Sequence, residues 1–145
     1  MSTRTAHTDW SGTLADGSGR VELSSSKVGS FDVSWPKRTA EEADGTTSPE
    51  ELIAAAHCSC YAMQFSALVA NAGGEPRSVQ VTADASFGPD PGGGFRITGI
   101  KLTVRARVDG LDESEFLKVA EAAKQTCPVS KALTGVDIVL DAALV

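Results

Sequence analysis

The residues in this sequence that could carry covalent chemistry are its cysteines. There are three, Cys58, Cys60 and Cys127, which are too few and too unevenly spaced for a secreted disulfide scaffold. In a reducing compartment a cysteine is usually a buried core residue, a metal ligand or a reactive nucleophile. The surrounding residues must decide among these three roles.

Zinc is the metal to consider, because His57 stands directly before Cys58 and two residues further on lies Cys60. This order, even with Cys127 added, lacks the paired spacing of protein zinc sites. Adjacent helical residues also point about 100° apart, so they do not converge on one ion. We therefore expect no metal and no cofactor, and we interpret His57 as a hydrogen-bonded core residue.

A reactive cysteine needs a positive charge nearby. The nucleophile is the thiolate, and a free cysteine with a pKa of about 8.5 is mostly protonated at neutral pH. Lys37 and Arg38 stand in the segment before the most apolar part of the chain. Arginine stays charged at any relevant pH and presents several donors, so Arg38 is our candidate for stabilising a thiolate.

A long helix is predicted to carry the first two cysteines. Ser48 offers an N-cap hydroxyl, Pro49 suits the first helical position, and Glu51 stands three residues after the cap. Residues 52–72 are apolar or small on every face, as expected for a helix surrounded by protein, and two glycines follow. Its polar and cysteine residues favour a core helix over a membrane span.

The remaining segments predict short strands and one more helix. Strands are expected at residues 19–24, 30–35, 78–87, 95–109 and 136–144, with a loop at 36–47 and an amphipathic helix at 112–125. This order predicts an α+β fold with antiparallel sheets. The length of 145 residues is that of one domain, so residues 1–145 are expected to form a single domain.

Charge and cysteine content limit the partners and the compartment. The net charge of −6 repels phosphate backbones and anionic lipid heads, so we expect neither nucleic acid nor a membrane as a partner. The first ten residues show no secretory signal. We therefore expect a cytoplasmic protein.

Two segments resemble motifs of one known family. Residues 47–63, TSPEELIAAAHCSCYAM, are similar to the helix motif of the OsmC (osmotically inducible protein C) family. Residues 126–130, TCPVS, are similar to its second cysteine motif. Element order, length and motif separation also match, so the resemblance covers essentially the whole chain. It implies antiparallel sheets around a buried central helix, in an obligate, intertwined homodimer with active sites at the subunit interface.

The resemblance also implies a function, a thiol-dependent peroxidase that reduces organic hydroperoxides and, more weakly, hydrogen peroxide. Cys60 would be the peroxidatic thiol, and Cys127 would resolve its sulfenic acid as a disulfide. Arg38 would hold the thiolate and the peroxide, and Glu50 would orient Arg38. A lipoyl-protein or thioredoxin-like dithiol would reduce the disulfide. Cys58 stands where similar sequences have a small residue, which indicates inert packing.

The surroundings of Cys60 favour an organic peroxide over a strongly hydrated one, because Tyr61, Met63 and Phe65 are apolar neighbours in sequence. Geometry adds a condition. Residues ten apart on a straight helix are about 15 Å apart along its axis, so Glu50 and Cys60 could not share a small site directly. Either Arg38 spans them or the helix is interrupted. We expect an interruption between Glu51 and Cys60, which would leave Cys60 near a helix N-terminus and lower its pKa.

Two other functions fit the sequence. One is a non-catalytic domain that binds a lipid-like ligand in an apolar pocket and has thiols of ordinary reactivity. The other is a thiol redox sensor that is oxidised without turnover. Peroxide-dependent turnover with a dithiol separates both from a peroxidase.

Overall fold

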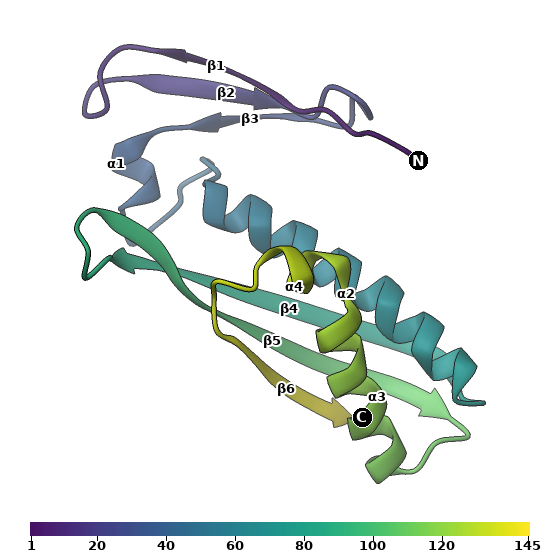
Figure 1. The fold of residues 1–145 in the computed structure, drawn as a ribbon. Coiled ribbons are helices and arrows are strands. Elements are labelled where there is room, and N and C mark those ends of the chain that lie inside the picture. Colours follow the sequence, from purple (N-terminus) through teal and green to yellow (C-terminus); the bar gives the residue numbers. More distant parts are fainter. The chain divides into compact units, whose positions relative to one another are not determined.

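The computed structural model describes residues 1–145 and divides into two compact units, residues 1–52 and 53–145 (Figure 1). The first unit contains an antiparallel sheet of β1 (His7–Ser11), β2 (Ser18–Glu22) and β3 (Ser30–Val33), followed by the short helix α1 (Trp35–Arg38). Strands β2 and β3 confirm the predicted strands. Strand β1 was missed because all five of its residues are exposed and give no alternation.

Helix α1 covers the last residue of the predicted strand 30–35 and the first three residues of the predicted loop 36–47, so both predictions are wrong at this boundary. The side chain of Ser34 accepts a hydrogen bond from the backbone N–H of Lys37, and Pro36 lies in the first turn. A cap and a proline at these positions are typical of a helix start. The helix is only four residues long, which leaves no room for an apolar period to reveal it.

Helix α2 (Pro49–Asn71) begins where the sequence predicts. The hydroxyl of Ser48 accepts a hydrogen bond from the backbone N–H of Glu51 at 3.2 Å. After the helix, Gly73 has a φ of 85°, a left-handed conformation that glycine adopts without strain, and Gly74 donates to the carbonyl of Val69 at 3.0 Å.

The expected interruption between Glu51 and Cys60 is wrong, because α2 is continuous through this region. The physical reason is local. No proline or glycine occurs between these residues, and the three consecutive alanines at 54–56 favour helix strongly. Cys60 is therefore in the middle of a helix and has no help from a helix N-terminus.

The second unit contains a mixed sheet in the order β4 (Glu75–Pro89), β5 (Phe95–Asp109) and β6 (Ile138–Leu144). Strands β4 and β5 form the predicted antiparallel hairpin, but β6 pairs with β5 in parallel, so the expectation of purely antiparallel sheets is wrong here. Helices α3 (Glu113–Thr126) and α4 (Pro128–Ala132) form the crossover that a parallel pair requires.

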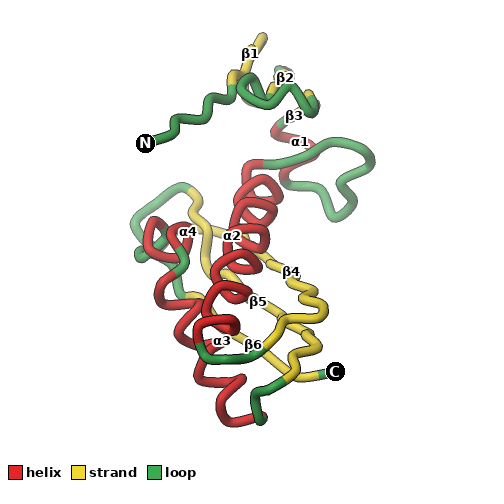
Figure 2. The backbone as a smooth tube through the Cα atoms, turned by 90° about the vertical axis from the view of Figure 1, so that its right-hand side faces the viewer, coloured by secondary structure: helices red, strands yellow, loops and turns green.

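Helices α2 and α3 cover the same face of this sheet (Figure 2). The buried core between these layers is made by Tyr61, Phe65 and Val69 of α2, Leu102, Val104 and Ala106 of β5, and Phe116, Ala120 and Ala123 of α3. Asp112 and Glu115 cap α3 reciprocally, each accepting from the other's backbone N–H. The cysteine-bearing part of α2 is thus held by an apolar core.

Only one face of α2 is buried in this single chain. Met63, for example, is 69% exposed, so the prediction of burial on every face is wrong for the isolated chain. By length and mean hydropathy, 1.4, α2 also meets the criteria for a membrane span, which core helices often do. Its polar His57 is fully buried against protein.

Candidate active site

The structure brings the two predicted redox cysteines together within the second unit. Cys60 lies on α2, and Cys127 lies between α3 and α4, as the C-cap of one helix and the N-cap of the other. Both are free thiols, Cys127 fully buried and Cys60 partly exposed. Cys60 packs against the buried core cluster that contains Cys127, and each thiol shifts the pKa of the other. Neighbouring thiols of this kind can form a disulfide.

The two thiols differ in acidity. Burial raises the pKa of Cys60 above its ordinary value and the neighbouring Cys127 raises it further, although the backbone N–H of Val129 acts the other way. Burial would also raise the pKa of Cys127, but the N–H and hydroxyl of Ser130, together with Cys60, lower it below its ordinary value. Within this unit the surroundings of the two thiols therefore act on their pKa values in opposite directions.

The third cysteine is separate from this pair in its interactions. Cys58 is partly exposed, and its thiol donates to the carbonyl of Ala55 one helical turn earlier, at 3.4 Å. This local bond fits the predicted packing role. The structure contains no group of three or more His, Cys, Asp or Glu side chains that could hold one metal ion.

Two buried polar residues stand beside the cysteine pair. The ring Nε2 of His57 lies 2.8 Å from the hydroxyl oxygen of Ser130, and burial lowers the pKa of His57. The hydrogen bond confirms the sequence interpretation of this histidine. Ser130, by contrast, was missed. Its spacing of three residues from Cys127 could have indicated it, because that spacing places a side chain one turn along at a helix start.

The other two predicted residues form a pair in the first unit. Arg38 donates two hydrogen bonds to Glu50, from Nε to Oε2 at 3.1 Å and from Nη2 to Oε1 at 2.7 Å. Burial would raise the pKa of Glu50, but the hydrogen bonds and charge of Arg38 hold it below its ordinary value. Glu50 thus fixes the guanidinium in one plane, as a bidentate partner does. Lys37 instead pairs with Asp44 at 2.8 Å.

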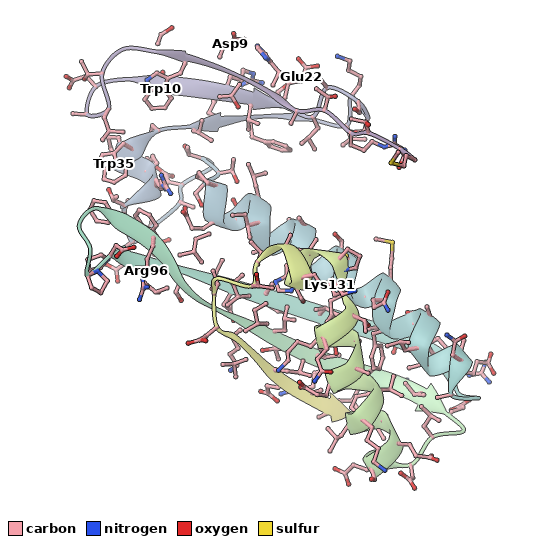
Figure 3. The ribbon with its side chains drawn as sticks, viewed as in Figure 1. Asp9, Trp10, Glu22, Trp35, Arg96 and Lys131 are labelled. Atoms are coloured by element: carbon pink, nitrogen blue, oxygen red, sulfur yellow. The ribbon has the colours of Figure 1, made fainter.

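Arg38 also borders an apolar cavity of about 280 Å³ within the first unit. Trp10 of β1 and Trp35 of α1 both line it and are labelled in Figure 3. The rest of the lining comes from Thr8, Leu14, Val21, Val33, Ser34, Thr47, Pro49 and Leu52. The guanidinium lies 5.8 Å from the Trp35 ring centroid, a cation–π distance. A fixed cation beside an apolar space suits a ligand with one polar and one hydrocarbon end.

The sequence argument for an organic substrate relied on the wrong residues. Tyr61 and Phe65 are fully buried in the core, where the Tyr61 hydroxyl donates to the carbonyl of Ala120 at 2.9 Å. Met63 points to the exposed side of the helix. Neighbours in a helical sequence point in different directions, so sequence proximity to Cys60 did not place them around its sulfur.

Comparison with known proteins agrees with this arrangement. The profile of the family described as OsmC-like protein matches residues 42–141. The chain belongs to the OsmC family. It is 37% identical to Peroxiredoxin OsmC of Escherichia coli strain K12 over 132 residues, covering 91% of this chain and 90% of the relative. It is 30% identical to the organic hydroperoxide resistance protein of Xanthomonas axonopodis pv. citri, covering 81% and 82%.

Solved structures of the family extend the likeness to the fold. The crystal structure of the organic hydroperoxide resistance protein OhrB of Bacillus subtilis superimposes with a TM-score of 0.75 at 29% identity, covering 96% of this chain and 98% of that one. The OsmC family match includes Glu50, Cys60 and Cys127, whereas Arg38 precedes it by four residues. The arginine assignment therefore depends more on the geometry of its pair with Glu50.

Proposed function

We propose that this protein is a thiol-dependent peroxidase that reduces organic hydroperoxides, and hydrogen peroxide more weakly. The observation that carries the proposal is that Cys60 packs against the core cluster of the second unit that contains Cys127. The mutual pKa shifts of the two thiols support it. Membership of a family that includes a peroxiredoxin and organic hydroperoxide resistance proteins supports it.

The reaction would proceed in three steps. The Cys60 thiolate attacks the terminal oxygen of the hydroperoxide, the O–O bond breaks, and the alkoxide leaves and takes a proton to become the alcohol. The thiolate of Cys127 then attacks the sulfur of the Cys60 sulfenic acid, and hydroxide leaves as water after protonation. Finally an external dithiol, from a lipoyl-protein or a thioredoxin-like protein, reduces the disulfide and is itself oxidised to a disulfide.

Cys60 needs a source of positive charge that the second unit does not supply, because the pKa of Cys60 is raised there. In our proposal Arg38 supplies it, holding both the thiolate and the peroxide, and Glu50 orients Arg38. The bidentate geometry of the Arg38–Glu50 pair supports this role. The apolar cavity beside Arg38 supports a hydrocarbon substituent on the peroxide.

The working form would be an intertwined homodimer with its active sites at the subunit interface. The uncovered apolar face of α2 supports association with a second copy, because a face of Ala55, Met63 and Ala67 is costly to leave in water. A cytoplasmic location belongs to the same proposal, since that compartment supplies dithiol reductants.

The test is rapid-mixing oxidation of the reduced protein by cumene hydroperoxide, followed by quenching and mass spectrometry. Wild type should lose two hydrogens as the disulfide forms. Cys127→Ser should instead gain one oxygen, because the sulfenic acid on Cys60 accumulates. Cys60→Ser should neither lose two hydrogens nor gain an oxygen. Cys58→Ser is the matched control on the same helix and should behave like wild type.

Each alternative predicts a different result. Slow oxidation shared by all four proteins would overturn the peroxidase proposal and favour an apolar-ligand-binding domain, to which the 280 Å³ cavity is suited. Fast oxidation without turnover by dihydrolipoamide or reduced thioredoxin would favour a redox sensor. A sulfenic acid that survives in Cys60→Ser but not in Cys127→Ser would exchange the roles of the two thiols.

A further inference from the structure

Hydrogen-bonded side chains connect the two elements that carry the predicted redox cysteines, α2 and the turn between α3 and α4 (Figure 2). The Nε2 of His57 on α2 lies 2.8 Å from the hydroxyl oxygen of Ser130 on α4. The Nε2 of Gln64 on α2 donates to the hydroxyl oxygen of Thr126, the last residue of α3, at 2.9 Å. The partners are 73 and 62 residues apart in sequence, so these bonds join segments that only the fold brings together.

The two bonds lie on either side of the cysteines. On α2, Cys60 follows His57 by three residues and precedes Gln64 by four, which is about 4.5 Å and about 6 Å along the helix axis. Residues at these spacings share one face of a helix. Facing them is the α3–α4 corner, residues 126–130, whose two end residues accept or share the bonds and whose second residue is Cys127.

A third bond from the same face of α2 reaches further back along α3. The hydroxyl of Tyr61, which is fully buried, donates to the carbonyl of Ala120 at 2.9 Å. The Tyr61 ring stacks on Phe65 with the centroids 6.0 Å apart, and Phe65 meets Phe116 of α3 edge to face at 5.6 Å. The helix that leads into the α3–α4 corner is therefore itself fixed against α2.

The bond between His57 and Ser130 is the most restrictive of these contacts. His57 is fully buried and Ser130 is 7% exposed, so breaking their bond would leave two polar groups without water. The Nδ1 of His57 has no hydrogen-bond partner, which leaves Nε2 as the one polar attachment of the ring. A hydrogen bond also requires a narrow range of distance and angle, whereas apolar surfaces can slide. The bond therefore favours one position of the corner.

A disulfide requires such a fixed position. The Cβ atoms of the two cysteines must come to about 3.8 Å with a dihedral angle of about 90°. Groups held in place react at a high effective concentration, and a displacement of about 1 Å can slow a reaction about a hundredfold. If the corner moved away, a second hydroperoxide could reach the Cys60 sulfenic acid. It would transfer one oxygen atom to the sulfur, which gives a sulfinic acid and an alcohol.

We infer that His57 and Gln64 are positioning residues for the resolving step, because their bonds hold the corner that carries Cys127 against α2. This role rests on the proposed function, and it lets the disulfide form while the corner stays folded. In that step the S–S bond forms between Cys127 and Cys60, the S–O bond of the sulfenic acid breaks, and the hydroxide that leaves is protonated to water. Disulfide formation then outpaces oxidation to the sulfinic acid.

The test measures how the sulfenic acid divides between disulfide and sulfinic acid, in a Cys58→Ser background that keeps only the two thiols concerned. Reduced protein is mixed with increasing cumene hydroperoxide, and mass spectrometry gives the concentration at which half of Cys60 has become sulfinic acid. His57→Leu should lower this concentration about tenfold, because a buried hydrogen bond is lost. Gln64→Leu should lower it about threefold, because its partner is exposed. The rate of the first oxidation of Cys60 should stay unchanged.

Rescue and coupling distinguish positioning from a general loss of stability. His57→Gln keeps an N–H at a similar reach and should recover most of the wild-type value. Thr126→Val removes the acceptor of the Gln64 bond, so adding Gln64→Leu to it should cause no further loss. Ser59→Ala removes an exposed hydroxyl from α2 and is the matched control.

Half-oxidation concentrations that neither His57→Leu nor Gln64→Leu changes would overturn the inference, as would additive losses in Gln64→Leu/Thr126→Val. If His57→Leu does not fold, the half-buried Gln64 and its exposed partner decide the question by themselves. If no protein forms a sulfenic acid, the proposed function fails. The positioning role is then decided by equilibrating the disulfide with glutathione, where wild type and His57→Gln should favour it about tenfold more than His57→Leu. Equal equilibria would show that the bond does not position the cysteines.

Discussion

At the scale of single residues, the Arg38–Glu50 pair depends most strictly on the type of side chain at each position. The guanidinium makes two hydrogen bonds to a carboxylate that is 7% exposed. Lysine would keep the charge but has no planar fork, so it would bind Glu50 through one point and leave its direction undefined. Arg38 is therefore a better candidate than a generic cation for holding a thiolate and a peroxide in fixed positions.

Arg38→Lys should slow the oxidation of Cys60 by cumene hydroperoxide about tenfold or more, because the orienting pair is lost while the charge remains. Stopped-flow mixing under pseudo-first-order conditions measures this rate. Lys37→Arg is the matched control, since Lys37 pairs with the exposed Asp44. A wild-type rate in Arg38→Lys would contradict the positioning role.

The same pair predicts a pH dependence of stability. The pKa of Glu50 lies below its ordinary value of 4.5 in the folded protein. A carboxyl group whose pKa is lowered by folding stabilises the folded state at any pH above its pKa in the unfolded state. This stabilisation is lost as the pH falls through the pKa of the folded state. Urea denaturation should thus show Glu50→Gln less stable than wild type at pH about 7, with the gap closing toward pH about 3. If the difference in free energy of unfolding between the two proteins did not change with pH, the ionisation of Glu50 would not contribute to stability.

At the scale of elements, the sequence predicted best where the signal was local. The start of α2 follows from Ser48, Pro49 and Glu51, and the structure contains the Ser48 hydrogen bond that these residues imply. The interruption of α2 was expected for a functional reason, to bring Glu50 near Cys60, although the local sequence contains no proline or glycine and has three consecutive alanines. Helix propensity prevailed, and in our proposal Glu50 acts instead through Arg38, to which it is hydrogen-bonded.

Other features could not be predicted because they depend on distant residues. Whether β6 joins the sheet parallel or antiparallel depends on how α3 and α4 return the chain, which strand alternation does not encode. The proximity of Cys60 to Cys127 in the core could be predicted from two sequence motifs. The contact between His57 and Ser130 was not, because nothing in either local sequence specifies the other.

The Ser48 cap gives a prediction at this scale. Ser48→Ala should reduce the free energy of unfolding by about 1 kcal/mol, because the backbone N–H of Glu51 loses its partner at the start of α2. Urea denaturation followed by circular dichroism measures the change. Ser59→Ala, on the exposed side of the same helix, is the comparison and should change stability by less than half as much. An equal loss of unfolding free energy in Ser48→Ala and Ser59→Ala would mean that the Ser48 cap does not specifically stabilise α2.

At the scale of the whole molecule, α2 connects the two groups of site residues. It carries Glu50, the partner of Arg38 in the first unit, and Cys60, the partner of Cys127 in the second. Its buried face is fixed by the core through Tyr61, Phe65 and Val69. The sequence is apolar on the opposite face too, which the single chain leaves uncovered. A helix of this kind is typical of a protein that completes its core by association.

Association through this face is testable with one substitution. Wild type should elute and scatter light as a dimer of twice the 15.0 kDa chain mass. Met63→Glu puts a charge into the exposed apolar face without touching the core, so it should weaken the dimer at least about tenfold while leaving the secondary structure intact. Leu117→Glu, at an exposed position on α3, is the matched control and should remain dimeric.

If the interface also completes the active site, Met63→Glu should lose peroxidase activity on dilution and recover it at high protein concentration. A wild-type protein that is monomeric and fully active would show that one chain holds the whole site and that the exposed face of α2 serves another purpose.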